Sequence, residues 1–136
     1  NSNIQNIFNK YFKQYTSQTH GEQLYIYYNP EKKKFEFDNI EGNVGDGYKK
    51  TEIISFDLAF ISFFIEMGLD FPKFVLHDKL EIIHKNQIQT TFDIANSING
   101  QFIVSVLKER IAFLGDAFID DRKILELSQD NKFFKF

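Results

Sequence analysis

In the segment Phe71-Pro72-Lys73-Phe74-Val75-Leu76-His77-Asp78, a turn signal leads into a short apolar run that ends in a carboxylate. Such a run is typical of a strand buried in a sheet. In parallel α/β sheets, ligands collect at the carboxyl ends of the strands. We therefore expect residues 74–77 to form a central strand, with Asp78 at the edge where ligands bind.

The segments that follow this strand complete a βαβ pattern. Residues 87–99 place apolar side chains on one face and stop before Gly100, which predicts a helix. Residues 102–107 are apolar apart from Ser105 and predict a second strand. A strand, a helix and a strand in this order are expected to form a parallel pair with a right-handed crossover.

The segments before the central strand predict a helix and a hairpin. In residues 4–16, apolar side chains recur at three- and four-residue steps, as in an amphipathic helix. Residues 24–28 and 34–38 are rich in aromatic residues and flank a turn that contains Pro30, so they predict a β-hairpin.

The middle of the chain predicts a loop and a buried helix. Residues 42–47 contain three glycines and are expected to form a loop. Residues 51–67 are apolar on nearly every side, as in a helix between two layers, and Gly68 should end it. In the tail, residues 123–127 predict another strand, and the terminal Phe rings at 133–136 are expected to dock on the body.

Composition limits the class of protein. The chain has 136 residues, of which 43% are hydrophobic and 26% charged, so we expect a single domain over residues 1–136. Its 17 Phe and six Tyr predict an aromatic core, with some rings left for a partner surface. The net charge of −3 argues against non-specific DNA binding.

Further classes are excluded by what the sequence lacks. Without cysteine the chain has no disulfide or thiolate metal site, which is compatible with the cytoplasm, where we expect it. No apolar run approaches the ~20 residues of a membrane span. Because the sequence begins with Asn1 rather than Met, we expect it to be a piece of a longer protein.

The strand at 74–77 followed by Asp78 has the outline of a Walker B strand, whose Asp holds Mg²⁺, usually through water. A G-x-x-x-x-G-K-[ST] loop, which would cradle the phosphates, does not occur in the sequence. The chain therefore carries only half of such a site.

Four further segments accompany this strand: Gly45-Asp46-Gly47 with Lys49 and Lys50, Ser55-Phe56-Asp57-Leu58-Ala59, Gln101-Phe102-Ile103-Val104, and Leu125-Glu126-Leu127-Ser128. In this order they resemble the domains at the C-terminus of bacterial YydD-type SMC-like ATPases, and more broadly the C-terminal lobe of a P-loop ABC-type ATPase head. The resemblance implies an α/β fold with a partly parallel sheet, packed helices, and an N-terminal helix and β-hairpin. Residues 1–20 would return from a coiled coil, and residues 21–136 would form the lobe.

The resemblance also implies a site for ATP and Mg²⁺. Asp78 would coordinate the metal. A signature loop offers backbone N–H groups and a helix N-terminus to the γ-phosphate of ATP on the opposing subunit of a head–head homodimer. The residues in place of that loop are Gly45, Asp46, Gly47, Lys49 and Lys50.

Departures from the family pattern limit the expected catalysis. Such heads have a Glu directly after the Walker B Asp to activate water, whereas Lys79 stands there and is no base near neutral pH. Glu81 is the candidate substitute base. The histidine expected after the next strand is absent, because residues 106–108 are Val, Leu and Lys. Hydrolysis should be slow, and the chain alone is not expected to hydrolyse ATP.

Structural roles remain open for the same residues. Asp78 could simply cap a turn at a strand end, and His77 is expected to be a hydrogen-bonded structural residue. Asp57 lies among apolar neighbours and should meet an Arg, a Lys or a backbone amine.

Two functions follow, and a third, a free-standing DNA-binding domain, is disfavoured by the net charge. The first is a C-terminal half-head, completed by an absent N-terminal lobe and acting in DNA repair or bacterial defence. The alternative is a catalytically degenerate protein-interaction module.

Overall fold

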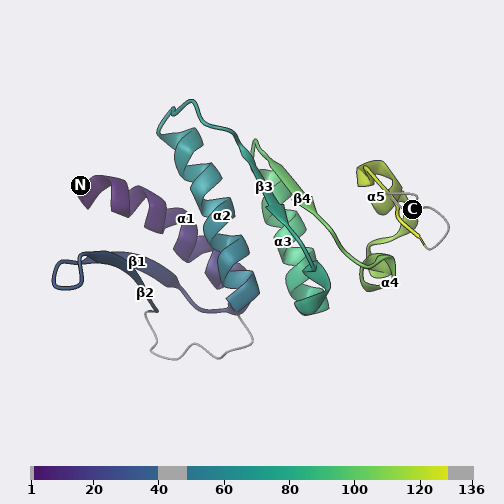
Figure 1. Ribbon diagram of the computed structural model, residues 1–136, viewed down its shortest axis with the longest axis horizontal. Helices are drawn as coiled ribbons and strands as arrows, with labels where there is room; N and C mark the ends of the chain where they lie inside the picture. The colour runs from purple at the N-terminus through teal and green to yellow at the C-terminus, as the bar shows by residue number, and fades with distance from the viewer. Residues whose placement is uncertain (1, 40–48, 129–136) are drawn as a thin grey trace, which may run out of the picture.

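The computed structural model describes residues 2–39 and 49–128 and shows a mixed α/β fold. Within these residues, five helices accompany two small sheets, one of them parallel (Figure 1). The elements in chain order are α1 (Ser2–His20), β1 (Leu24–Asn29), β2 (Lys34–Asn39), α2 (Lys49–Glu66), β3 (Phe74–His77), η2 (Leu80–Ile82), α3 (Lys85–Ser97), β4 (Gln101–Val104), α4 (Lys108–Ile111), η3 (Ala112–Leu114) and α5 (Asp116–Arg122).

Helices α1 and α2 pack against each other and form the centre of the core. Phe12 of α1 and Ile54 of α2 are completely buried, as is Leu80 of η2. The rings of Phe8 and Phe56 join the two helices with centroids 5.0 Å apart. The predicted aromatic core is thus confirmed, because Phe side chains fill the space between the helices.

The β1–β2 hairpin is antiparallel, as predicted, and lies on α1 through buried polar groups. The Asn9 side-chain amide donates to the carbonyl of Ile26 at 2.9 Å, and its carbonyl oxygen accepts from the Ile26 amide at 2.8 Å. The Thr16 hydroxyl oxygen accepts from the Leu24 amide at 2.9 Å. These bonds explain why Asn9 and Thr16 are buried on an otherwise apolar helix face.

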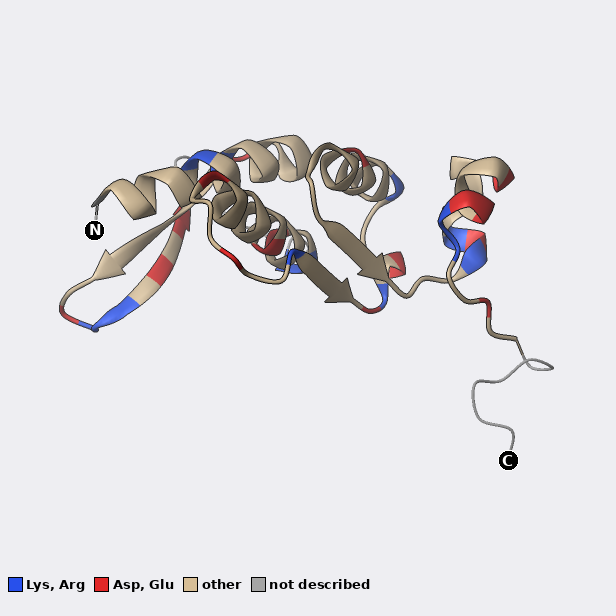
Figure 2. Ribbon diagram, turned by 90° about the horizontal axis from the view of Figure 1, so that it is seen from above, with Lys and Arg blue, Asp and Glu red and all other residues tan. Residues whose placement is uncertain are grey.

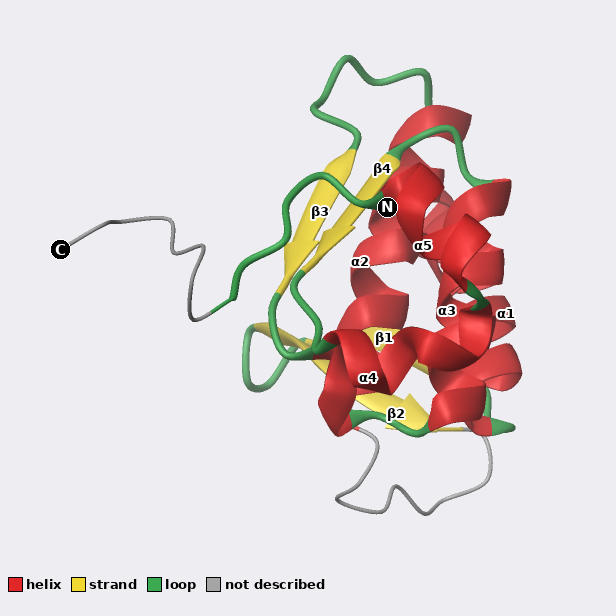
Figure 3. Ribbon diagram, turned by 90° about the vertical axis from the view of Figure 1, so that its right-hand side faces the viewer, coloured by secondary structure: helices red, strands yellow, loops and turns green. Residues whose placement is uncertain are grey.

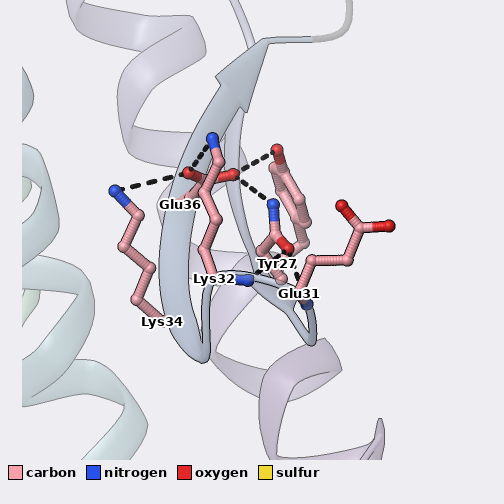
Figure 4. Close-up of polar contacts among 6 residues, drawn as sticks. Tyr27, Glu31, Lys32, Lys34 and Glu36 are labelled. Atoms are coloured by element: carbon pink, nitrogen blue, oxygen red, sulfur yellow. Dashed lines mark hydrogen bonds and ion pairs between the residues drawn. The ribbon is translucent and has the colours of Figure 1, made fainter.

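The outer face of the hairpin holds a carboxylate surrounded by donors (Figure 4). Glu36 accepts hydrogen bonds from Lys32 at 2.8 Å, Asn29 at 2.8 Å and Tyr27 at 3.0 Å. The hydrogen bond from Lys32, followed by those from Asn29 and Tyr27, lowers the pKa of Glu36 from 4.5 to about 2.

We expect this cluster to make the hairpin sensitive to strong acid. Because the folded pKa is depressed, the stabilisation is present above pH 4.5 and is lost as the pH falls through about 2. A pH titration followed by the carboxyl ¹³C shift of Glu36 should have its midpoint near 2. In a Lys32→Met variant the midpoint should move toward 4.5; an unchanged midpoint would refute Lys32 as the main cause.

Strands β3 and β4 are parallel and are joined through α3, so the predicted βαβ unit is confirmed. His77 pairs in register with Val104. Val75 and His77 face the helices, whereas Phe74 and Leu76 on the other face are 48% and 64% exposed. In Figure 3 the helices lie on one side of these two strands, and no described helix lies on their outer side.

The chain after β4 differs from the prediction. Strand β4 ends at Val104, where a strand to residue 107 was expected, and α4, η3 and α5 follow it. The strand predicted at 123–127 is wrong: these residues adopt no regular structure, because no described strand lies beside them. Ile124 and Leu125 are instead 83% and 57% exposed.

Candidate functional site

The candidate site lies where the N-terminal end of α2 meets the C-terminal end of β3 (Figure 1). Helix α2 leads back to β3 through Gly68, whose φ of 63° allows the helix to end there, as predicted. At the other end of this sheet, the amide of Gln101 donates to the carbonyl of Lys73 at 2.7 Å. A Cβ on Gly100 would come within 2.9 Å of the same carbonyl, so glycine permits the close approach of the start of β4 to the residue before β3.

Asp78 follows β3 directly and its side chain is 75% exposed. The ammonium of Lys50, in the first turn of α2, lies 3.4 Å from its Oδ1. The Lys50 side chain is only 19% exposed, so its stem packs against the protein and only the end reaches the edge of the sheet. Two of the predicted site residues, 28 positions apart in sequence, are therefore brought together in the same chain.

A second contact between α2 and β3 lies beside the first. The Nε2 of His77 is 3.2 Å from Oδ2 of Asp57, within ion-pair distance, although the two groups are not aligned as a hydrogen bond. The His77 side chain is 5% exposed, and its ring lies 5.7 Å from that of Phe102. The partner that the structure gives Asp57 is thus a histidine ring, where an Arg, a Lys or a backbone amine was expected.

Lys79, the residue after Asp78, has a left-handed backbone with φ 50° and ψ 52°. This conformation is unfavourable for a residue with a Cβ and is often found at functional sites. Two hydrogen bonds to Ser105, the residue after β4, stabilise this conformation. The Lys79 amide donates to Oγ of Ser105 at 3.3 Å, and the Leu80 amide donates to the Ser105 carbonyl at 3.2 Å. The chain thus turns sharply after Asp78 and leaves its carboxylate at the tip of the turn.

Glu81, the candidate base, lies in η2 with one carboxylate oxygen, Oε2, buried. That atom has no hydrogen-bond partner among the residues described. The Glu81 backbone carbonyl accepts from Arg110 at 2.8 Å, which joins η2 to α4. The carboxylate therefore points at least partly into the body, and its role as a base stays a prediction.

The remaining predicted phosphate-binding residues are placed only in part. Gly45, Asp46 and Gly47 lie outside the described residues. Lys49 is exposed in the first turn of α2, next to Lys50. Burial raises the pKa of Glu52 in the same turn, and the charge of Lys49 partly offsets this effect.

The described ranges contain no cluster of three or more His, Asp or Glu side chains that could hold a metal ion. They also contain no helix that is both long and apolar enough to cross a membrane. Figure 2 shows Lys and Arg spread from the hairpin to α5 and interspersed with Asp and Glu. Both signs of charge are thus mixed along the described elements, in agreement with the small net charge.

A protein-family model described as "uncharacterised protein conserved in bacteria (DUF2326)" matches residues 5–136. The chain belongs to this family. The matched range includes every candidate residue discussed above. Searches of curated proteins and of solved structures each returned no match.

The Lys50–Asp78 and Asp57–His77 contacts were not predicted as pairs. Their spacing in the sequence indicates these pairs only once the packing of α2 against β3 is known. Lys50 and Asp57 are seven residues apart, about two turns of one helix face, and their partners are adjacent at a strand end.

Proposed function

We propose that this chain is the C-terminal lobe of an SMC-like ABC-type ATPase head, which contributes Asp78 to an ATP site that an N-terminal lobe completes. The observation that supports this most is the position of Asp78. It stands, exposed, directly after a strand of a parallel pair, at the sheet edge where nucleotides bind in α/β proteins.

The parallel pair itself supports the need for a second lobe. Parallel sheets are normally covered on both faces, yet Phe74 and Leu76 of β3 are largely exposed. Within the described chain, β3 and β4 pair only with each other, so one backbone edge of each strand is unpaired. A two-stranded sheet is marginal alone. Further strands and a covering layer from an N-terminal lobe would complete it.

The residues present fit a Mg²⁺ ion that is shared with a nucleotide. Mg²⁺ prefers oxygen ligands, keeps several waters, and is commonly bound through one or two carboxylates together with phosphates. The exposed carboxylate of Asp78 is such a ligand, and the described residues offer no all-protein cage. When bound, Mg²⁺ would offset the negative charge of the transferred phosphoryl group.

The chain's own residues would prepare this position. The left-handed turn at Lys79 and its bond to Ser105 hold Asp78 at the end of β3. The contact between Asp57 and His77 brings the last residue of β3 next to α2. Lys79 cannot activate water as a glutamate would, so turnover should be slow unless another group, such as Glu81, acts as the base.

One observation favours the second candidate function, a degenerate interaction module. Lys79 replaces the expected glutamate, while Phe74, Leu76 and Phe71 offer an apolar surface to a partner. The two functions differ in ATP turnover, which the module would lack. In the first function, turnover by the protein encoded by the complete reading frame should depend on Asp78.

If an N-terminal lobe completes the sheet, the outer face of β3, which carries Phe74 and Leu76, should be covered in the complete protein. A cysteine introduced on this face can report on its accessibility, because the sequence of this chain contains no other cysteine. In Leu76→Cys, a thiol reagent should label residue 76 at least about tenfold more slowly than residue 31 in Glu31→Cys, which lies in the exposed hairpin turn. Peptide mass spectrometry measures both rates. Equal rates would show that no lobe of the same protein covers this face.

A further inference from the structure

The contact between Lys50 and Asp78 places a cation at the N-terminal end of α2, which helix formation does not explain. Lys50 lies in the first turn of α2, where the helix dipole disfavours a cation. Its ammonium nevertheless reaches the edge of the neighbouring sheet, 3.4 Å from Oδ1 of Asp78, on a stem that is mostly buried. Fixing a long, flexible side chain in this way costs conformational entropy.

Stability alone is a weak reason for this arrangement. Asp78 is 75% exposed, and ion pairs with an exposed partner contribute little to folding. The contact has a clear electrostatic consequence, however. A fixed positive charge beside the carboxylate opposes the arrival of a second cation at the same oxygen.

We infer that Lys50 is the resident counter-ion of Asp78 and competes there with a divalent cation. This inference rests on the proposed function, because it takes Asp78 to be a metal ligand. A divalent cation displaces the ammonium from the carboxylate, and the displaced ammonium is then available to the phosphates that accompany the cation. Lys50 thereby disfavours the bare ion and favours the ion that arrives with a nucleotide.

Binding of Mn²⁺ without nucleotide tests this competition in the complete protein. Free Mn²⁺ is measured by electron paramagnetic resonance at physiological ionic strength. Lys50→Met keeps the stem and removes the charge, and should tighten Mn²⁺ binding about threefold to tenfold, as expected when a unit charge is removed close to a partly exposed ion. Lys50→Arg keeps the charge and should bind Mn²⁺ like the wild type.

Lys73→Met is the matched control, since it removes the same charge just before β3, at the opposite end of the strand. Residue 73 is about 16 Å from residue 78 along the strand, roughly twice the Debye length at this ionic strength. Its Mn²⁺ affinity should equal that of the wild type. Far-UV circular dichroism verifies that each variant is folded.

The Asp78→Asn variant distinguishes failure of the proposed metal role of Asp78 from failure of the competition by Lys50. If Asp78→Asn binds Mn²⁺ as the wild type does, the metal role of Asp78 is wrong, and this inference fails with it. If Asp78→Asn weakens binding while Lys50→Met binds no more tightly than Lys73→Met, the competition alone is wrong. Weakened binding in Asp78→Asn together with tightened binding in Lys50→Met supports both.

Discussion

Replacing Phe12 by alanine should lower the free energy of unfolding by about 3–5 kcal/mol. Phe12 is completely buried and joins three elements. Its ring centroid lies 5.7 Å from those of Phe8 in α1 and Phe56 in α2, and 6.0 Å from that of Phe37 in β2. The substitution therefore opens a cavity where the hairpin, α1 and α2 meet, and little can collapse to fill it.

Phe35→Ala is the matched control for this prediction. Phe35 is 60% exposed near the hairpin turn, where its ring contacts Tyr28 at 5.5 Å. Its loss should cost about 1 kcal/mol or less. Urea denaturation followed by circular dichroism measures both variants. Equal losses of stability would contradict the assignment of the core to the α1–α2 interface.

The elements up to β4 could be predicted because each has a strong local signal. The apolar run at residues 74–77 gave the bounds of β3, and the turn around Pro30 gave the hairpin. The predicted ends of α1, α2 and α3 differ by one to four residues from those observed, since helix ends fray and their caps vary. Helix α1 extends to His20, beyond the predicted residue 16, and ends before Gly21, whose φ is 77°.

The tail could not be predicted because its signal was ambiguous. Residues 123–127 have the composition of a strand, but a strand needs a neighbour, and no described strand provides one. Helix α5 begins after Gly115 and buries Ile119, while Phe118 contacts Phe92 of α3 at 5.7 Å. Seven residues are too few for a clear helical period.

The site could be predicted as a set of residues but not as contacts. Asp78 and Lys50 were both candidates, yet the role implied for Lys50 was toward ATP on an opposing subunit, and the structure places its ammonium at Asp78 of the same chain. The pairing depends on how α2 packs against β3, which local sequence does not encode. The partner of Asp57 was missed for the same reason, with His77 reaching it from the strand.

Replacing Asp78 by asparagine should reduce ATP turnover of the complete protein on the order of 100-fold, because a carboxylate that helps to hold the catalytic metal is lost. The side chain is largely exposed and lies at a strand end, so the fold should be little affected. A large loss of turnover without loss of stability would identify Asp78 as part of the site rather than as a capping residue.

Asp93→Asn is the matched control for the loss of charge. Asp93 is an exposed residue of α3 that accepts a hydrogen bond from Gln89 at 3.0 Å and is not one of the candidate site residues. Its turnover should stay within about twofold of the wild type, as for most surface substitutions away from a site. Thermal unfolding of both variants checks that neither effect arises from instability.

The role of Asp78 in an ATP site can be measured as the steady-state rate of Mg²⁺-dependent ATP hydrolysis by the complete protein and by its Asp78→Asn and Asp93→Asn variants. We expect slow hydrolysis in the wild type, the same rate in Asp93→Asn, and a rate at the background level in Asp78→Asn. Hydrolysis that is unchanged in Asp78→Asn, or absent from the wild type, would contradict a working half-site on this chain.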